Sequence, residues 1–171
     1  MVLVVAGLPA TGKSTLAELV ARDLAAPVFA WDRLMAPLKK HRLLAGLGYE
    51  KCLDLGFDMI QALVLNQLRL GQPAIVDSLV DRRRIDEWRA AVADRGGTLR
   101  VVECHCSDRE LHRERLSGRS RDIPGWHEVD WAHVERMAQR FPPLAEVDAR
   151  IDAVRPVAAG RDLINRLVRG A

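Results

Sequence analysis

The sequence predicts an α/β fold of three layers, in which helices cover both faces of a five-stranded parallel sheet. Short apolar runs alternate with longer amphipathic ones along the whole chain, the pattern of repeated strand–helix–strand units. No internal repeat, low-complexity tract or linker divides the 171 residues, and this length suits one domain. We therefore expect residues 1–171 to form a single domain.

Each expected element is assigned from its apolar pattern and from the turn residues that flank it. Strands are expected over 2–6, 28–31, 73–77, 99–104 and 149–153, and helices over 13–24, 33–44, 50–70, 81–94, 107–116, 130–140 and 158–169. Ser107 is the expected N-cap of the fifth helix, because Glu110 three residues later completes a capping box. Residues 117–128 are polar and hold two glycines and a proline, so we expect a mobile loop there.

The composition is that of a soluble globular protein, with 49% hydrophobic and 29% charged residues. A net charge of +3 and a pI of about 9.0 suit anionic substrates such as nucleotides, but are too weak to indicate a nucleic-acid partner. Three cysteines do not suggest a disulfide framework, and no apolar run reaches membrane length. We expect a cytoplasmic monomer or homodimer with no membrane partner.

The sequence Cys104-His105-Cys106 resembles a fragment of a metal site. A zinc site needs further ligands, and no second pair of suitable residues follows elsewhere in the chain. The alternating pattern that begins at Leu99 favours the end of a strand instead.

A phosphate-binding motif follows the first strand. Residues 7–14 match G-x-x-x-x-G-K-[ST] at every fixed position, with an apolar strand before them and an amphipathic helix after them. The glycines allow the loop to wrap a phosphate with backbone N–H groups, and the helix that follows adds its positive dipole end. The expected ATP-binding residues of this phosphate loop, 7–15, are Gly7, Leu8, Pro9, Ala10, Thr11, Gly12, Lys13, Ser14 and Thr15.

Within this loop, three side chains have distinct expected roles. Lys13 places a positive charge on the β- and γ-phosphates, and Ser14 Oγ is an expected Mg²⁺ ligand. Thr15 is expected to touch the α-phosphate. The predicted cofactors are thus ATP and Mg²⁺.

Two aspartates end expected strands, at the sheet edge where chemistry collects in open α/β folds. Asp32 follows the second strand and can take the proton from an acceptor hydroxyl, or orient that hydroxyl. Asp77 ends the third strand and resembles a Walker B aspartate, which serves Mg²⁺; contact with the acceptor is the other role open to it. Each aspartate also precedes a helix, so a purely structural N-cap is the alternative.

Four arginines gather at the end of the fifth helix and the start of the loop that follows: Arg113, Arg115, Arg119 and Arg121. Arg115 and Arg119 are four residues apart and are expected to share a helical face. One can stack on adenine while the other reaches the transferring phosphoryl group, because a guanidinium both stacks and binds phosphate oxygens. A solvated basic helix face remains the alternative.

Together these features resemble P-loop kinases of the nucleoside-monophosphate-kinase type, over nearly the whole chain. That resemblance implies a three-layer P-loop NTPase sandwich with a helical lid near 117–128. Residues 115–119, RLSGR, are similar to the lid start of adenylate kinases, which implies Arg115 on adenine and a catalytic Arg119 on phosphate. Residues 29–37 look closer to chloramphenicol phosphotransferase, zeta toxins and polynucleotide 5′-kinases, where the aspartate matching Asp32 is the proposed base.

The expected function is an ATP-dependent kinase that moves the γ-phosphate to a hydroxyl of a small molecule such as an antibiotic or sugar. A nucleoside or nucleotide kinase, a polynucleotide 5′-kinase and an ATPase switch without an acceptor remain alternatives. The acceptor-binding segment should be the helices over 33–70, but the gluconate kinase acceptor motifs are absent. Candidate lining residues are Trp31, Tyr49, Phe57, Trp126 and His127.

Overall fold

Five parallel strands form one sheet in the order β2-β3-β1-β4-β5. The computed structural model describes residues 1–126 and 128–170. The strands are β1 (Val2–Gly7), β2 (Val28–Ala30), β3 (Ala74–Ser78), β4 (Leu99–His105) and β5 (Ala149–Asp152). The helices are α1 (Lys13–Leu24), α2 (Trp31–Lys40), α3 (Tyr49–Arg69), α4 (Arg82–Ala93), α5 (Arg109–Ser117), α6 (Trp131–Arg140) and α7 (Val157–Arg169). The expected three-layer fold with five parallel strands is confirmed.

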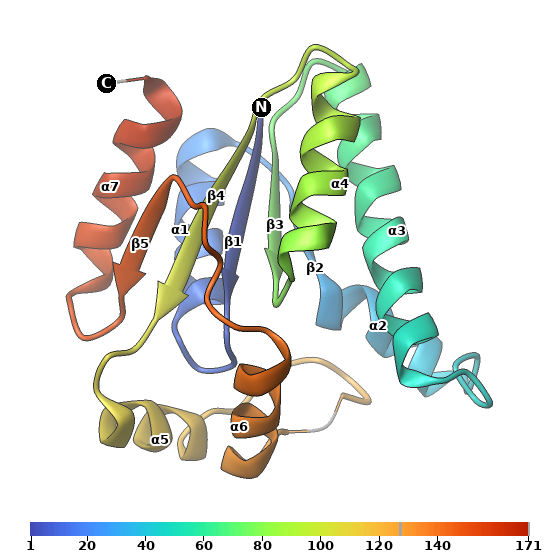
Figure 1. The fold of residues 1–171 in the computed structure, drawn as a ribbon, viewed down its shortest axis with the longest axis vertical. Helices are drawn as coiled ribbons and strands as arrows, with labels where there is room; N and C mark the ends of the chain where they lie inside the picture. Colours follow the sequence, from blue (N-terminus) through green and yellow to red (C-terminus); the bar gives the residue numbers. More distant parts are fainter. Residues whose placement is uncertain (127, 171) are drawn as a thin grey trace.

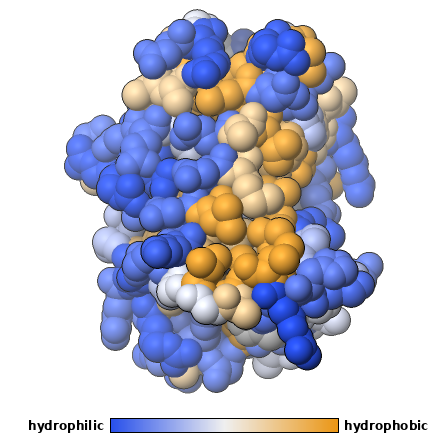
Figure 2. Space-filling model, turned by 90° about the vertical axis from the view of Figure 1, so that its right-hand side faces the viewer, coloured by the Kyte–Doolittle hydropathy of each residue, from blue (hydrophilic) through white to orange (hydrophobic). Residues whose placement is uncertain are grey.

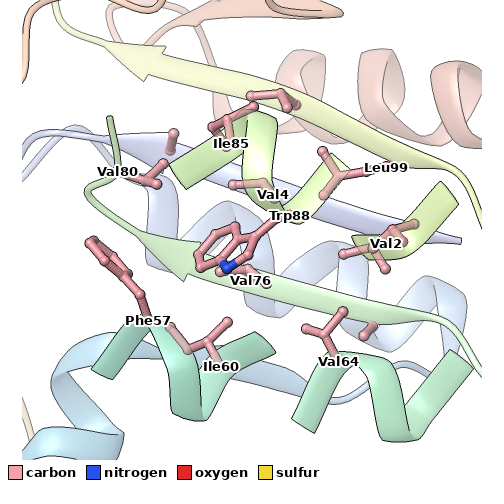
Figure 3. Packing of buried hydrophobic residues seen from close by; sticks show 14 of the residues in the cluster. Val2, Val4, Phe57, Ile60, Val64, Val76, Val80, Ile85, Trp88 and Leu99 are labelled. Atoms are coloured by element: carbon pink, nitrogen blue, oxygen red, sulfur yellow. The ribbon is translucent and has the colours of Figure 1, made fainter. Parts of the chain in front are cut away.

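Alternate residues of β1 build the two halves of the core. Val2 and Val4 pack toward α3 and α4, whereas Leu3 and Val5 pack toward α1 and α7. Successive side chains of a strand point to opposite faces, so a strand covered on both sides must be apolar throughout. In Figure 3, Phe57, Ile60 and Val64 of α3 meet this sheet together with Trp88 of α4.

Helices α5 and α6 lie beyond the carboxyl ends of the strands, apart from the two layers that cover the sheet (Figure 1). The segment that joins α5 to α6 has no regular secondary structure in its described residues and passes toward α2. The carboxyl edge of the sheet, where the phosphate loop also lies, is thus covered by α5, α6 and this segment.

Two sequence expectations about helix ends were wrong. The helix expected over 33–44 starts at Trp31 and ends at Lys40, and Arg42 then takes a left-handed φ of 59° that cannot continue it. Asp108, not Ser107, caps α5: its side chain accepts a hydrogen bond from the Leu111 N–H at 3.0 Å. The Ser107 side chain instead bonds to Asp152 and lowers the pKa of that carboxyl, and the Ser107 N–H donates to Asp152 at 3.1 Å. A long-range partner thus decided which of two capping residues was used.

Large exposed hydrophobic side chains fall into two groups. One lies on the α2–α3 side and includes Leu43, Leu47, Leu55 and Leu70. Figure 2 shows hydrophobic residues running as a band between hydrophilic ones on this side of the molecule. The other group, Val154 and Val157, lies where β5 leads into α7. Within the described residues, no helix is both long and apolar enough to span a bilayer.

Candidate active site

The loop between β1 and α1 is held in a conformation that few side chains allow. Gly7 has a φ of 149°, and a Cβ there would overlap the Cys104 carbonyl of the neighbouring strand. Ala10 and Gly12 are also left-handed, with φ values of 65° and 79°. The Thr11 hydroxyl donates to the Leu8 carbonyl at 2.8 Å and so braces the loop from within. The loop is therefore wrapped tightly, as a phosphate cradle requires.

Lys13 and Asp77 form a buried pair at the start of α1. Lys13 Nζ lies 3.8 Å from Asp77 Oδ1, and the two side chains are 10% and 8% exposed. Asp77 belongs to β3 and is not a helix cap, because Asp81 caps α4 by accepting from the Arg84 N–H. The structural alternative for Asp77 is thereby excluded.

Asp77 Oδ1 is buried and accepts no hydrogen bond from any described residue. A buried carboxylate oxygen without a donor is costly unless a cation or water completes its surroundings. The Asp77 carboxylate and the Ser14 hydroxyl offer hard oxygen ligands of the kind that Mg²⁺ takes. Ser14 also lines the cavity beside the loop. These residues therefore fit the expected metal.

A cavity of about 460 Å³ opens beside the loop, within the range of small-molecule sites. Three segments form its walls: the phosphate loop with the start of α1, the end of α5 with the residues after it, and the β5–α7 turn. The residues that line it are Ala10, Thr11, Gly12, Lys13, Ser14, Thr15, Leu16, Cys104, Arg115, Gly118, Arg119, Ser120, Ile151, Asp152, Ala153, Arg155, Pro156 and Val157. The lining thus combines apolar residues such as Pro156 and Val157 with the amine of Lys13, as a nucleotide site requires.

Arg115 and Arg119 both line this cavity, although the expectation that they share a helical face was wrong. Helix α5 ends at Ser117, so Arg119 lies outside it and the two do not share a helical face. Arg115 Nη1 donates to the Ala153 carbonyl at 2.8 Å and thereby links α5 to the β5–α7 turn. Arg113 instead lies against the Trp131 ring, with its guanidinium carbon 5.0 Å from the ring centroid.

Arg119 is a partly buried cation with an open donor. Burial lowers the pKa of its guanidinium, and the neighbouring Arg121 lowers it further. The negative charges of Asp32, Glu128 and Asp77 favour its charged form in return. Its Nη1 atom is buried without an acceptor among the described residues. An anion in the cavity would supply one.

Asp32 lies in the first turn of α2 and does not cap it, since the N-cap position is Ala30. Its carboxylate Oδ2 instead accepts from Arg121 Nη1, across 89 positions of sequence. Arg121 is 13% exposed and also lies 3.9 Å from Glu128 Oε2. The N-cap alternative for Asp32 is excluded, and the carboxylate faces the lid.

The expected lining residues separate into different places. Trp31, which precedes Asp32, and Trp126, from the segment after α5, pack edge to face with ring centroids 5.8 Å apart. Phe57 is a core residue against Trp88, and Tyr49 touches Met137 of α6. His127 lies outside the described residues. Of the expected lining residues that the structure describes, Trp31 adjoins Asp32 in sequence and Trp126 packs on Trp31.

Sequence reasoning missed His112, which is 5% exposed and binds the Pro9 carbonyl of the phosphate loop at 2.7 Å. It also missed the pairing of Arg121 with Asp32. A single His in a polar helix carries no signal in its spacing, and the two contacts join residues 103 and 89 positions apart. These contacts follow from the sheet topology and not from a local motif.

A parallel sheet in this strand order, with a glycine-rich loop after β1 and an arginine-rich segment after α5, is the P-loop kinase type of fold. The chain belongs to the AAA domain family AAA_33, whose sequence model matches residues 2–144. No curated protein sequence matches it.

Solved structures agree on the fold. A sugar kinase from Janibacter sp. HTCC2649 matches with a TM-score of 0.72 and 16% identity, over 95% of this chain and 91% of that one. A gluconokinase from Sinorhizobium meliloti 1021 has a TM-score of 0.69 and 21% identity, over 94% and 86%. A Mycobacterium tuberculosis APS kinase in complex with AMPPNP and APS has a TM-score of 0.68 and 20% identity, over 98% and 96%.

Proposed function

We propose that this protein is an ATP-dependent phosphotransferase that moves the γ-phosphate of ATP to a hydroxyl group of a small molecule. One observation carries the proposal: two carboxylates lie at the same edge of neighbouring strands, Asp77 of β3 beside Lys13 and Asp32 just after β2, where Arg121 binds it. A nucleotide-binding switch would need the first carboxylate and not the second. A carboxylate beyond the phosphate site is the group that an acceptor hydroxyl requires.

The proposed roles follow from the positions of the groups. The loop N–H groups and Lys13 hold the β- and γ-phosphates, and Arg119 stabilises the charge that develops on the transferring group. Asp32 receives the hydroxyl proton on one oxygen while Arg121 holds the other in place. Ser14 and Asp77 would hold Mg²⁺, which would neutralise phosphate charge during the transfer. Residues 117–128 serve as the lid that excludes water.

The chemical class of the acceptor rests on likeness rather than on contacts. The stretch around Asp32 resembles chloramphenicol phosphotransferase and its relatives, and the neighbouring fold matches include a sugar kinase and a gluconokinase. Both favour a polyhydroxyl compound of modest size, and we propose this class as the acceptor.

One alternative is weakened by the structure. A polynucleotide 5′-kinase would use basic runs such as residues 82–84 to follow a nucleic-acid backbone. Arg84 is instead buried and binds Asp54 at 2.7 Å and Asp58 at 3.0 Å, both on α3. Arg83 is bound to Glu87 at 2.7 Å. Arg84 therefore ties α4 to α3, and the carboxylates that meet Arg83 and Arg84 would compete with phosphates for them.

The test compares Asp32→Asn with the wild type, using ADP release from Mg-ATP in the presence of a library of hydroxyl compounds. Some compounds should stimulate the wild type, and Asp32→Asn should transfer about 10²- to 10⁴-fold more slowly, the range for lost general-base help. Affinity for AMPPNP should persist in the variant, because the loop and Lys13 are unchanged.

Asp122→Asn is the matched control, since it neutralises an exposed carboxylate of the same lid segment whose described contact uses its backbone carbonyl. It should transfer at the wild-type rate. An Asp32→Asn protein that transfers as fast as the wild type would remove Asp32 from the mechanism. ATP turnover that no hydroxyl compound stimulates would support a switch instead of a kinase.

A further inference from the structure

His112 is a buried polar side chain that the proposed mechanism does not use. It lies on α5, one helical turn before Arg115, and is 5% exposed. Its Nε2 atom is 2.7 Å from the carbonyl oxygen of Pro9, in the middle of the phosphate loop. A carbonyl oxygen can only accept, so Nε2 must carry the proton. The loop is therefore held from outside by a donor on the helix that leads into the lid.

This hydrogen bond fixes the orientation of one peptide plane. In a trans peptide the C=O and N–H groups point in opposite directions, and no cis peptide occurs among the described residues. The Pro9 carbonyl points to His112, so the Ala10 N–H points away from it. Ala10 lines the cavity, and this N–H is therefore one of the donors available to a phosphate there.

The same peptide lies in a conformation that the loop does not favour by itself. Ala10 has a φ of 65°, and a left-handed conformation is unfavourable for a residue with a Cβ. A rotation of the Pro9–Ala10 peptide would relieve Ala10 and turn its N–H out of the cavity. Such a rotation would also break the bond to His112. The hydrogen bond thus opposes the peptide rotation that would turn the Ala10 N–H out of the cavity.

His112 is itself held in place by aromatic packing. Its ring meets the Trp131 ring edge to face, with centroids 5.1 Å apart. Glu135 accepts from Trp131 Nε1 at 2.8 Å and from Arg109 at 2.6 Å, which fixes the indole between α5 and α6. The imidazole is therefore positioned by contacts within and between α5 and α6.

We propose that His112 is a positioning residue for nucleotide binding: its Nε2–H holds the Pro9–Ala10 peptide so that the Ala10 N–H faces the phosphates. The proposal rests on the proposed function, because it requires that the cavity take a nucleotide. Both the neutral Nε2–H form and the imidazolium can donate this bond, so its role does not depend on the charge of the ring.

The test uses two variants that separate the donor from the ring. His112→Phe keeps an aromatic ring against Trp131 and removes the donor, whereas His112→Gln removes the ring and places an amide N–H near the position of Nε2. Calorimetry measures binding of Mg-AMPPNP and of inorganic tripolyphosphate, which lacks the base. His112→Phe should bind both about 3- to 10-fold more weakly, the range that one hydrogen bond spans. His112→Gln should regain most of this affinity.

A packing role predicts the reverse order, with His112→Phe like the wild type and His112→Gln impaired, and that result would overturn the proposal. Weakened AMPPNP binding with unchanged tripolyphosphate binding would overturn it too. If His112→Phe does not fold, the imidazole ¹⁵N spectrum of the wild type decides: a proton on Nε2 supports the proposal, and a proton on Nδ1 alone refutes it. A wild type that binds neither probe would instead refute the proposed function.

Discussion

The proposed nucleotide end and the proposed acceptor end of this site are assembled in different ways. At the nucleotide end, one uninterrupted stretch of nine residues supplies the loop, and its amine Lys13 meets a single buried carboxylate from the adjacent strand. At the acceptor end, Asp32 meets Arg121 from a segment 89 positions away, and Trp31 meets Trp126. A local motif determines the nucleotide end, whereas the acceptor end depends on how the segment after α5 packs against α2.

The two ends also differ in exposure. Lys13 and Asp77 are nearly inaccessible, whereas Asp32 is 32% exposed and the second partner of Arg121, Glu128, belongs to the exposed lid. A buried charged pair tolerates little change, because removing one member leaves the other unpaired in a poorly solvated place. The acceptor end can be altered at lower energetic cost. We therefore expect substitutions at the two ends to give separable effects.

The largest effect is expected at Lys13. Lys13→Met should slow phosphoryl transfer by about 10²- to 10³-fold, as when one preorganised electrostatic donor is removed. It should also reduce the free energy of unfolding by about 1–3 kcal/mol, because the Asp77 carboxylate is left without its cation.

The double variant Lys13→Met/Asp77→Asn separates these two effects. It should recover much of the stability in thermal unfolding but none of the transfer rate, because the neutral amide that replaces the Asp77 carboxylate no longer needs a cation. If the double variant recovered activity, Lys13 would act only by compensating Asp77.

A smaller effect is expected at Gly56, which lies under the acceptor end. A Cβ at this position would overlap the Trp31 indole, so Gly56→Ala must push Trp31 away from α3. Overpacking of this kind costs about 1–3 kcal/mol of stability. Transfer to the acceptor should fall while AMPPNP affinity, measured by calorimetry, should stay unchanged.

Gly48→Ser is the control, since a Cβ there meets nothing within 4 Å and serine suits the N-cap of α3. It should leave both quantities unchanged. A Gly56→Ala variant that lost AMPPNP affinity and kept its acceptor kinetics would contradict the division of the site into two ends.

The smallest perturbation is chemical labelling of Cys104, at the base of the nucleotide cavity. Burial raises the pKa of this thiol to about 12, because the thiolate is poorly solvated there. At pH 8 roughly one thiol in 10⁴ is then ionised, and only the thiolate reacts. A thiol reagent should therefore modify Cys52 and Cys106 first. Labelling of Cys104 as fast as Cys106 would show that the nucleotide end opens readily.

The sequence was sufficient for the sheet, the helices and the phosphate loop, because periodicity and the glycine–lysine spacing are local signals. It also pointed to Asp32 and Asp77 by their place after strands, although it could not separate a site role from capping. That choice depends on partners, which are Arg121 for Asp32 and Lys13 for Asp77. The use of Asp108 instead of Ser107 as the cap of α5 likewise goes with a distant contact, between Ser107 and Asp152.

The hydrogen-bonded pair of Asp32 and Arg121 bears on how fast such a protein hydrolyses ATP when no acceptor is bound. If Asp32 is the base, Arg121 already occupies one of its carboxylate oxygens, which leaves fewer positions for a stray water molecule next to bound ATP. An acceptor molecule with several contacts can hold its hydroxyl against the other oxygen, whereas a water molecule makes too few contacts to be held there. A resting cell would then lose little ATP to futile hydrolysis by this protein, and consumption would follow the supply of acceptor.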